Sequence, residues 1–228
     1  MSSPDPDARF EYTNSARTGD AGRSVLVIAC GAIAREVVAV IEQNGLRNID
    51  ITCLPAIWHN YPDRIPEGVR EKIREGKKRY DRIFVAYGDC GTGGLLDKVL
   101  EEEGGVERLP GPHCYAFFTG TDTFMTGTAD EIDAFYLTDY LARHFDTLIW
   151  KGFGIEKHPE LRDMLFAHYR KVVFLVQVPD EGLLEVARGV ADKLELAFEV
   201  RHTGYGDLTA SLQTANDGGK ADADVIGL

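Results

Sequence analysis

The sequence predicts an α/β protein whose mostly parallel sheet, or sheets, are flanked by helices. Three observations support this prediction. Short apolar runs recur along the chain, and such runs are typical of strands that are buried on both faces of a parallel sheet. Glycine-containing turns follow several of these runs, and segments with the spacing of amphipathic helices come next. Repeated units of strand, turn and helix favour a sheet built in two or three pseudo-equivalent lobes.

The first half of the chain contains such units in succession. Residues 24–29 are continuously apolar and are interrupted by Cys30 and Gly31, which predicts a buried strand followed by a turn. Gly45 is a typical residue to end the helix that comes next. The elements expected in this half are a strand at 24–29, a helix at 32–44, a strand at 49–54, an irregular loop at 55–62, a helix at 66–78, a strand at 82–86 and a helix at 95–103.

The second half repeats the alternation less regularly. We interpret the spacing of Phe135, Leu137, Leu141 and Phe145 as one long helix. Asp180 is a typical cap for the start of a later helix. The elements expected in this half are one at 106–118 that opens near a rigid Pro-Gly-Pro turn, a helix at 131–150, a helix at 158–169, a strand at 172–176, a helix at 181–194, a strand at 196–201 and a short helix from 208.

Length and composition bound the domain organisation. The chain has 228 residues, of which 44% are hydrophobic and 27% charged, enough for one sizeable core. The two ends lack sustained periodicity and are rich in small and polar residues. We therefore expect a flexible arm at 1–23, a single α/β domain of catalytic type at 24–212 and a flexible tail at 213–228.

Charge and cysteine content exclude several classes of partner. A formal net charge of −12 argues against binding to nucleic acid or to an anionic membrane, because both require clustered Lys and Arg. No apolar run approaches the roughly 20 residues of a membrane span, and the start of the chain lacks the pattern of a signal peptide. We expect a cytoplasmic protein. Its 4 cysteines are too few for a disulfide scaffold, so they are either buried apolar residues or reactive groups.

Three of the cysteines share a context that indicates a metal site. Cys30 and Cys90 each come after an apolar strand and precede a glycine, and Cys114 lies beside His113. Because the carboxyl ends of parallel strands meet at one edge of a sheet, these thiols are expected to converge. Three thiolates suit an iron-sulfur cluster, our first choice, or zinc, with a position left open for substrate. Cys53, in mid-strand, is expected to be an inert core residue. The glycines expected to leave room for the bound group are Gly31, Gly91, Gly93 and Gly94.

Acid and base groups near the same edge would complete such a site. We expect Asp89, His113, His59 and Tyr205 to move protons there. Two alternatives stay open: the cysteines are buried residues without chemistry, or Cys90 acts alone as a nucleophile. The start of a helix favours the thiolate of Cys90, whereas the charge of Asp89 opposes it. The glycine-rich turn is not a phosphate loop of the usual kind, because it lacks the lysine that such loops contain.

A set of short motifs resembles one known family over roughly residues 24–212. The motifs are ACGA at 29–32, LPA at 54–56 with HN at 59–60, YGDCGTGG at 87–94, HCY at 113–115, LTD at 137–139, HPELRD at 158–163 and TGYG at 203–206. They are similar to those of domain-of-unknown-function family 1638. The resemblance implies a setting in one-carbon or methylamine metabolism, since such proteins are encoded near corrinoid-dependent methylamine and betaine methyltransferases. It also implies a corrinoid protein or a methyltransferase as a partner.

These observations lead to one principal functional expectation. We expect a metal-dependent lyase, hydrolase or transferase that acts on a small polar molecule, with Cys30, Cys90 and Cys114 as the metal ligands. The first alternative is a non-catalytic accessory protein that binds a cofactor or a corrinoid methyltransferase. The second is a metal-free enzyme with a cysteine nucleophile.

Overall fold

The computed structural model describes residues 9–14, 24–126 and 132–218. The chain folds as two compact units. Unit 1 is formed by Met1–Cys114 together with Asp207–Leu228, and unit 2 by Tyr115–Gly206. Each unit has its own sheet, and the mostly parallel α/β class that the sequence predicts is confirmed.

Unit 1 is built on a five-stranded sheet in the order β1-β3-β2-β4-β5. β1 is antiparallel to β3, and the other neighbouring strands are parallel. Every residue of β2 and β3 is buried, as expected of strands that are covered on both faces. The strands are β1 (Phe10–Tyr12), β2 (Val25–Cys30), β3 (Ile49–Leu54), β4 (Arg82–Ala86) and β5 (Glu107–Arg108).

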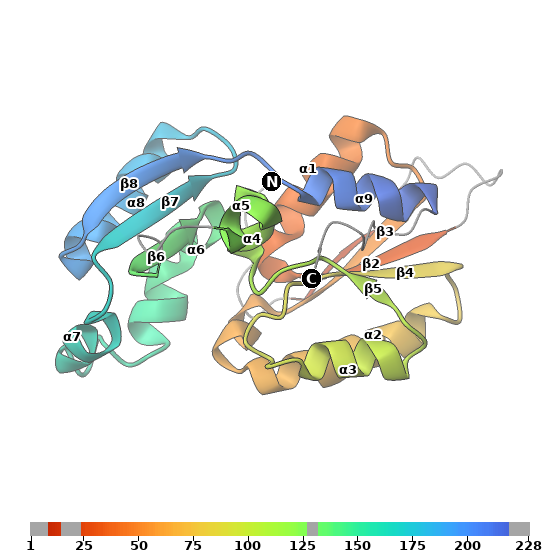
Figure 1. Ribbon diagram of the computed structural model, residues 1–228, viewed down its shortest axis with the longest axis horizontal. Helices are drawn as coiled ribbons and strands as arrows, with labels where there is room; N and C mark the ends of the chain where they lie inside the picture. The colour runs from red at the N-terminus through yellow and green to blue at the C-terminus, as the bar shows by residue number, and fades with distance from the viewer. Residues whose placement is uncertain (1–8, 15–23, 127–131, 219–228) are drawn as a thin grey trace. The chain divides into compact units, whose positions relative to one another are not determined.

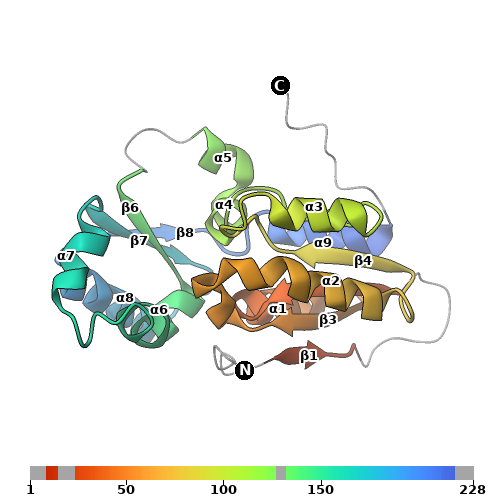
Figure 2. The ribbon, with the colours of Figure 1, turned by 90° about the horizontal axis from the view of Figure 1, so that it is seen from below.

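Helices cover both faces of this sheet. α1 (Ala34–Asn44) and α9 (Leu208–Asp217) pack together on one face (Figure 1). α2 (Ile65–Gly76) and α3 (Leu95–Glu102) lie side by side on the other (Figures 1 and 2). Single helical turns connect the main elements at η1 (Gly31–Ile33), η2 (Ala56–Asn60) and η3 (Pro62–Arg64).

The strand order places a topological switch point between β2 and β4. From β2 the chain runs through α1 to β3 on one side, and through α2 it then crosses to β4 on the other side. The connections that follow β2 and β4 therefore diverge to opposite faces of the sheet, an arrangement that in open parallel sheets leaves a crevice beyond the carboxyl ends of the strands. Such crevices are where open parallel sheets bind their ligands.

The helical turn η2 packs closely on helix α2 at a glycine. A Cβ atom added to Gly68 would lie 2.3 Å from the ring of Trp58, so only glycine allows this approach. Trp58 lies on η2, directly before His59. The loop that carries His59 is thereby fixed against α2.

Unit 2 contains a three-stranded parallel sheet in the order β6-β7-β8. The helices α6 and α8 pack against each other. The elements in and leading into this unit are α4 (Cys114–Thr119), α5 (Thr121–Met125), β6 (Ala134–Thr138), α6 (Asp139–Phe145), the π-helix η5 (Asp146–Lys151), α7 (Glu160–Phe166), β7 (Lys171–Val176), α8 (Glu181–Leu194) and β8 (Ala197–His202).

The prediction of one long helix at 131–150 is wrong. Residues Ala134–Thr138 form strand β6, and helix α6 begins only at Asp139. The apolar and aromatic residues of β6 favour a strand, and the Thr138 hydroxyl accepts a hydrogen bond from the Leu141 amide, which starts the helix there. Residue 131 lies outside the described residues.

The predicted flexible ends also differ from the structure where it describes them. Phe10–Tyr12 pairs with β3 as an edge strand, and α9 continues to Asp217. Residues 1–8, 15–23 and 219–228 of the predicted arm and tail lie outside the described residues.

Candidate functional site

Two thiols meet at the switch point of unit 1. Cys30 is the last residue of β2, and Cys90 lies on the loop after β4. Their side chains are 4% and 8% exposed, respectively. Both residues thus lie at the carboxyl ends of neighbouring parallel strands, and the convergence of all three predicted cysteines on one bound group stays a prediction.

Hydrogen-bond donors surround the sulfur of Cys30. It accepts the backbone N–H of Ala32 at 3.3 Å, and it lies 3.6 Å from Nδ1 of His59. The hydroxyl of Tyr87 also lies near it, although the two do not form a hydrogen bond of standard geometry. Burial raises the pKa of Cys30 to about 12. The donors Ala32 and Tyr87 act to lower this pKa, and the charge of the buried Glu36 acts to raise it. Cys30 is therefore a neutral thiol at ordinary pH.

The imidazole of His59 connects the two thiols. Its Nδ1 lies 3.0 Å from the carbonyl oxygen of Ala56, and because a carbonyl only accepts, we assign the proton to Nδ1. In the neutral ring the lone pair is then on Nε2. The ring is also close enough to Cys90 for the two side chains to interact, although their contact is not an aligned hydrogen bond. Contacts between catalytic groups often tighten only when substrate binds.

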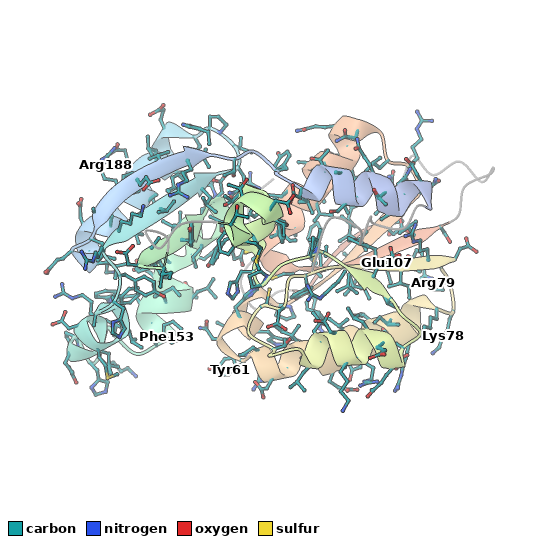
Figure 3. The ribbon with its side chains drawn as sticks, in the orientation of Figure 1. Tyr61, Lys78, Arg79, Glu107, Phe153 and Arg188 are labelled. Atoms are coloured by element: carbon teal, nitrogen blue, oxygen red, sulfur yellow. The ribbon has the colours of Figure 1, made fainter. Side chains whose placement is uncertain are left out.

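The pKa of His59 is raised by its partners. Burial acts to lower it, but the interaction with Cys90, the charge of that thiolate and the Ala56 carbonyl together outweigh burial. The ring keeps an exposed surface, so burial lowers its pKa less than the interaction with Cys90 raises it. Tyr61, close by on the same loop, is also exposed (Figure 3). The site can be reached from solvent on this side.

The backbone of Cys90 is unusual. Its φ angle is +51°, in the left-handed region that residues other than glycine rarely adopt. Its amide donates to the Pro112 carbonyl at 2.8 Å, and Gly91, with a φ of +81°, continues the turn. Strained backbone of this kind occurs at functional sites, where surrounding contacts hold it in place.

Asp89 builds the loop around Cys90. Its carboxylate accepts the hydroxyl of Thr92 at 2.7 Å and the amides of Gly94 at 2.8 Å and Gly93 at 3.1 Å. Burial acts to raise the pKa of Asp89, but these hydrogen bonds, with the charge of Arg108, hold it below its ordinary value. The amides that an outside phosphate would need are thus already occupied, and Gly93 and Gly94 serve the turn.

The turn that contains His113 packs directly against this loop. A Cβ atom added to Gly88 would lie 3.0 Å from the backbone nitrogen of His113, so Gly88 permits the contact. Burial lowers the pKa of His113, the nearby charge of Asp89 opposes this, and the charge of His59 adds to it. Cys114 follows at the start of α4 and is half-buried. His113 thus joins the cluster, and Cys114 is its neighbour in the chain.

The other residues discussed in the sequence analysis, Gly31, Cys53 and Tyr205, do not contribute side chains to these contacts. Gly31 lies close to the backbone of residues 54–56. A Cβ atom added to Gly31 would lie 3.2 Å from the carbonyl oxygen of Leu54. Cys53 is 1% exposed in β3, as its mid-strand position predicts. Tyr205 belongs to unit 2, after β8, and its role at the thiol site stays a prediction.

Three residues that act on the thiols were not predicted as site residues. Tyr87 is 1% exposed, and burial, followed by the charges that the neighbouring Cys30, Cys90 and Cys53 carry when ionised, raises its pKa well above the ordinary value. Glu36 is buried on α1 and Arg108 lies at the end of β5, and their charges act on Cys30 and Cys90 respectively. A charged residue within the apolar run of α1 is the one sequence signal that could have indicated Glu36.

The side chains do not form a ready set of metal ligands. Within residues 9–14, 24–126 and 132–218, no group of three or more His, Cys, Asp and Glu side chains is arranged to hold a metal ion. All 4 cysteines are free. The contacts described above define a thiol-imidazole cluster of Cys30, His59, Cys90 and His113.

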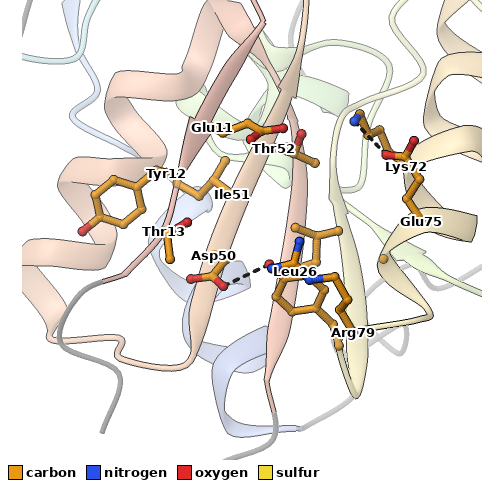
Figure 4. A pocket seen from close by; sticks show the side chains of 12 residues that line it. Glu11, Tyr12, Thr13, Leu26, Asp50, Ile51, Thr52, Lys72, Glu75 and Arg79 are labelled. Carbon is orange, nitrogen blue, oxygen red and sulfur yellow. Dashed lines mark hydrogen bonds and ion pairs between the residues drawn. The ribbon is translucent and has the colours of Figure 1, made fainter.

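A cavity elsewhere in unit 1 has a different character. It has a volume of about 130 Å³ and lies between β1, β3 and α2 (Figure 4). The buried Asp50 in its wall accepts the Tyr80 hydroxyl at 3.0 Å and the Asn14 amide at 2.9 Å. These bonds tie the chain after β1 to the sheet, which is a structural role.

Comparison with known proteins identifies a family without a described activity. The model of a family described as "Protein of unknown function (DUF1638)" matches residues 53–212, a segment that includes His59, Cys90 and Cys114. No curated protein matches the chain. None of the helices in the described part of the chain is long and apolar enough to cross a membrane. The match spans most of the sequence, so the chain belongs to the DUF1638 family, as its motifs predict.

Proposed function

We propose that the chain is a cysteine-dependent enzyme in which Cys90 attacks an electrophilic carbon of a small polar substrate. The observation that supports this best is the left-handed backbone of Cys90 beside the ring of His59, whose Nδ1 is fixed by the Ala56 carbonyl. A nucleophile, an acid-base group beside it and a third group that orients the latter are the parts of thiol catalysis.

In the proposed step, His59 first takes the thiol proton of Cys90, the thiolate sulfur forms a bond to the substrate carbon, and the bond from that carbon to the leaving group breaks. The leaving group takes the bonding electrons together with the proton that His59 holds. The raised pKa of His59 favours its protonated form, which suits a proton donor.

His113 is the proposed base for the second half of the reaction. Its lowered pKa keeps the ring neutral, so it can take a proton from the water or acceptor that releases the product. Two groups whose pKa values are moved in opposite directions are typical of an acid and a base in one site. Asp89 contributes by shaping the loop rather than by moving protons.

The rate at which each cysteine is alkylated by iodoacetamide tests the proposal. We expect Cys90 to react first at neutral pH and Cys30, with its high pKa, to react very slowly. His59→Gln should slow the alkylation of Cys90, because the imidazole that lies beside the sulfur is lost. His168→Gln, at an exposed histidine of unit 2, is the matched control. Equal reactivity of Cys90 and Cys114, unchanged by His59→Gln, would contradict the proposal.

A metal-thiolate enzyme is the second candidate. It is favoured by the donors around the Cys30 sulfur, because hydrogen bonds to sulfur stabilise metal-bound thiolates. Cys114 would have to turn toward Cys30 and Cys90 to complete the predicted three ligands. An iron-sulfur cluster or zinc held there would act as a Lewis acid on the substrate.

Metal analysis distinguishes the two candidates. The protein would be purified without oxygen and assayed for iron, sulfide and zinc, alone and with Cys30, Cys90 or Cys114 changed to alanine. Stoichiometric metal that each change removes, together with protection of Cys90 from alkylation, supports the metal enzyme. Metal-free protein with a reactive Cys90 supports thiol catalysis.

The biological setting rests on less direct arguments. Four free thiols suit the reducing cytoplasm, where we propose that the protein acts. One-carbon metabolism and a corrinoid or methyltransferase partner follow from the family resemblance alone and stay predictions.

A further inference from the structure

We propose that Arg108 is the positioning residue of the Cys90 loop, and that it sets the conformation in which this thiol reacts. The inference rests on the proposed function of Cys90. It assigns a role to a residue that no motif and no family description singles out.

Arg108 is anchored on both sides of its guanidinium. It lies at the end of β5, and its main chain continues into a hydrogen bond from the Leu109 amide to the Val85 carbonyl of β4. Nε and Nη2 donate to the two carboxylate oxygens of Asp97 on α3, at 2.5 and 2.9 Å. A two-point pair of this kind fixes the plane of the guanidinium as well as its position.

The third nitrogen of the guanidinium organises the turn beside the thiol. Nη1 donates to the carbonyl oxygens of Leu109 at 2.7 Å and Gly111 at 3.3 Å. The same Gly111 carbonyl accepts the amide of Asp89 at 3.1 Å, and the next carbonyl, of Pro112, accepts the amide of Cys90 at 2.8 Å. Hydrogen bonds therefore connect Arg108 through the Gly111 carbonyl to Asp89, and the backbone of the turn carries this anchoring one residue on, to the bond between Pro112 and the strained Cys90.

Charge supports the same assignment. The side chain of Arg108 is 17% exposed, and its positive charge lies close enough to interact with both Asp89 and the thiolate of Cys90. The other groups that act on Cys90 or its loop are His59 from η2, Tyr87 after β4 and His113 in the adjacent turn. Arg108 is the cation that β5 contributes to this set.

Arg82 offers a closely matched comparison at the opposite end of β4. It also is partly buried, pairs with a carboxylate, that of Glu107, at 2.8 Å, and donates to two carbonyl oxygens, those of Thr214 and Ala215. Its partners are on α9 and at Glu107, which precedes Arg108 in β5 but, as neighbouring residues of a strand do, points to the opposite face of the sheet. A change at Arg82 therefore removes similar bonds without touching the thiol.

The experiment compares Arg108→Gln, Arg108→Lys and Arg82→Gln in the full chain by two measurements. Amide hydrogen exchange at Asp89 and Cys90 reports on the loop, and the pH profile of Cys90 alkylation reports on the thiol. We expect Arg108→Gln to speed exchange at both amides about tenfold, the effect of one lost charge-assisted hydrogen bond, and to move the alkylation profile to higher pH. Arg82→Gln should leave both readouts at their wild-type values.

The Arg108→Lys variant separates the effect of the positive charge from that of the guanidinium geometry. It also replaces Arg108→Gln as the test if that variant fails to fold. A lysine keeps the charge but cannot bind Asp97 and two carbonyls at once, so exchange should still rise while alkylation is partly retained. Unchanged exchange at Asp89 and Cys90 in a folded Arg108 variant would overturn the inference. A wild-type Cys90 that is unreactive would instead refute the proposed function, and the exchange data would still decide the role of Arg108.

Discussion

At the scale of single residues, Cys90 combines a reactive side chain with an unfavourable backbone. A left-handed φ places the Cβ atom near the following carbonyl, which costs roughly 1–2 kcal/mol in any residue but glycine. Glu195, at the end of α8, is the other such residue of the described chain. At Glu195 the strain closes a helix, whereas at Cys90 it presents a thiol to His59.

The strain at Cys90 should be measurable as stability. We predict that Cys90→Gly unfolds at a higher denaturant concentration than Cys90→Ala, with a free energy of unfolding about 1 kcal/mol larger. The free energy of unfolding of Glu195→Gly should likewise be larger than that of Glu195→Ala. At Cys53, in a regular strand, alanine should be the more stable, since glycine weakens strands. Chemical denaturation of the six variants tests this, and a Cys90→Ala protein as stable as Cys90→Gly would contradict it.

Sequence reasoning located the thiols more successfully than their partners. Cys30 and Cys90 are found from the strand ends because parallel strands finish at a common edge. The Ala56 carbonyl that orients His59, and the capture of Gly93 and Gly94 by Asp89, are backbone contacts that leave no signature in residue type. Asp89 therefore looks like an acid-base group in the sequence and acts as a loop anchor in the structure.

At the scale of elements, α2 and α3 are joined by an ion-pair network around Glu103. Its carboxylate pairs with Arg74 at 2.8 Å and with Arg70 and Lys77 at 3.2 Å. Hydrogen bonds, of which the one from Arg74 has the largest effect, hold the pKa of Glu103 at about 2. The carboxylate is covered by cationic side chains rather than by the apolar core, so salt can still screen these pairs.

The sign of the pH effect follows from this lowered pKa. The ion pairs contribute stability above the ordinary glutamate value of 4.5 and lose it as the pH falls toward 2. We predict that Glu103→Gln lowers the melting temperature at pH 7 and that the difference from wild type vanishes near pH 2. Glu102→Gln, which removes the single pair with Arg70, should have a smaller effect. Thermal unfolding across this range, with a difference independent of pH, would refute the assignment.

Elements with clear boundaries in the sequence were predicted well. The strands at 49–54 and 82–86 and the helix at 181–194 have the predicted bounds. The segment at 131–150 failed because Phe135, Leu137 and Leu141 fit a helical spacing as well as a strand followed by a capped helix. Only the Thr138 cap separates the two, and its effect depends on the pairing of β6 with β7.

At the scale of the whole molecule, the chain leaves unit 1 at Cys114 and returns to it at Asp207. The returning helix α9 packs on α1, and its Leu208 and Leu212 are fully buried. The last helix of the described residues therefore completes the core of the unit that the first strands begin. This closure joins distant parts of the sequence, so periodicity within α9 could not reveal it.

Truncation tests this dependence. We predict that a chain ending at 206 loses on the order of 3 kcal/mol or more of stability in unit 1, because two buried leucines are removed. Hydrogen exchange should accelerate in α1 and β2, whereas β7 of unit 2 keeps its protection. A chain ending at 218 retains α9 and is the control. Unchanged exchange in α1 of the shorter chain would show that α9 is dispensable.

The tight packing of Trp58 on Gly68 has a spectroscopic consequence. This indole is immobilised against α2 and is covalently adjacent to His59. The second of the 2 tryptophans, Trp150, lies in unit 2 beside the Lys193 ammonium, 4.0 Å from its ring. A Trp150→Phe protein would thus carry a single tryptophan, next to the thiol site, and its emission, excited selectively over that of the tyrosines, would follow substrate capture, alkylation or metal binding in real time without a label.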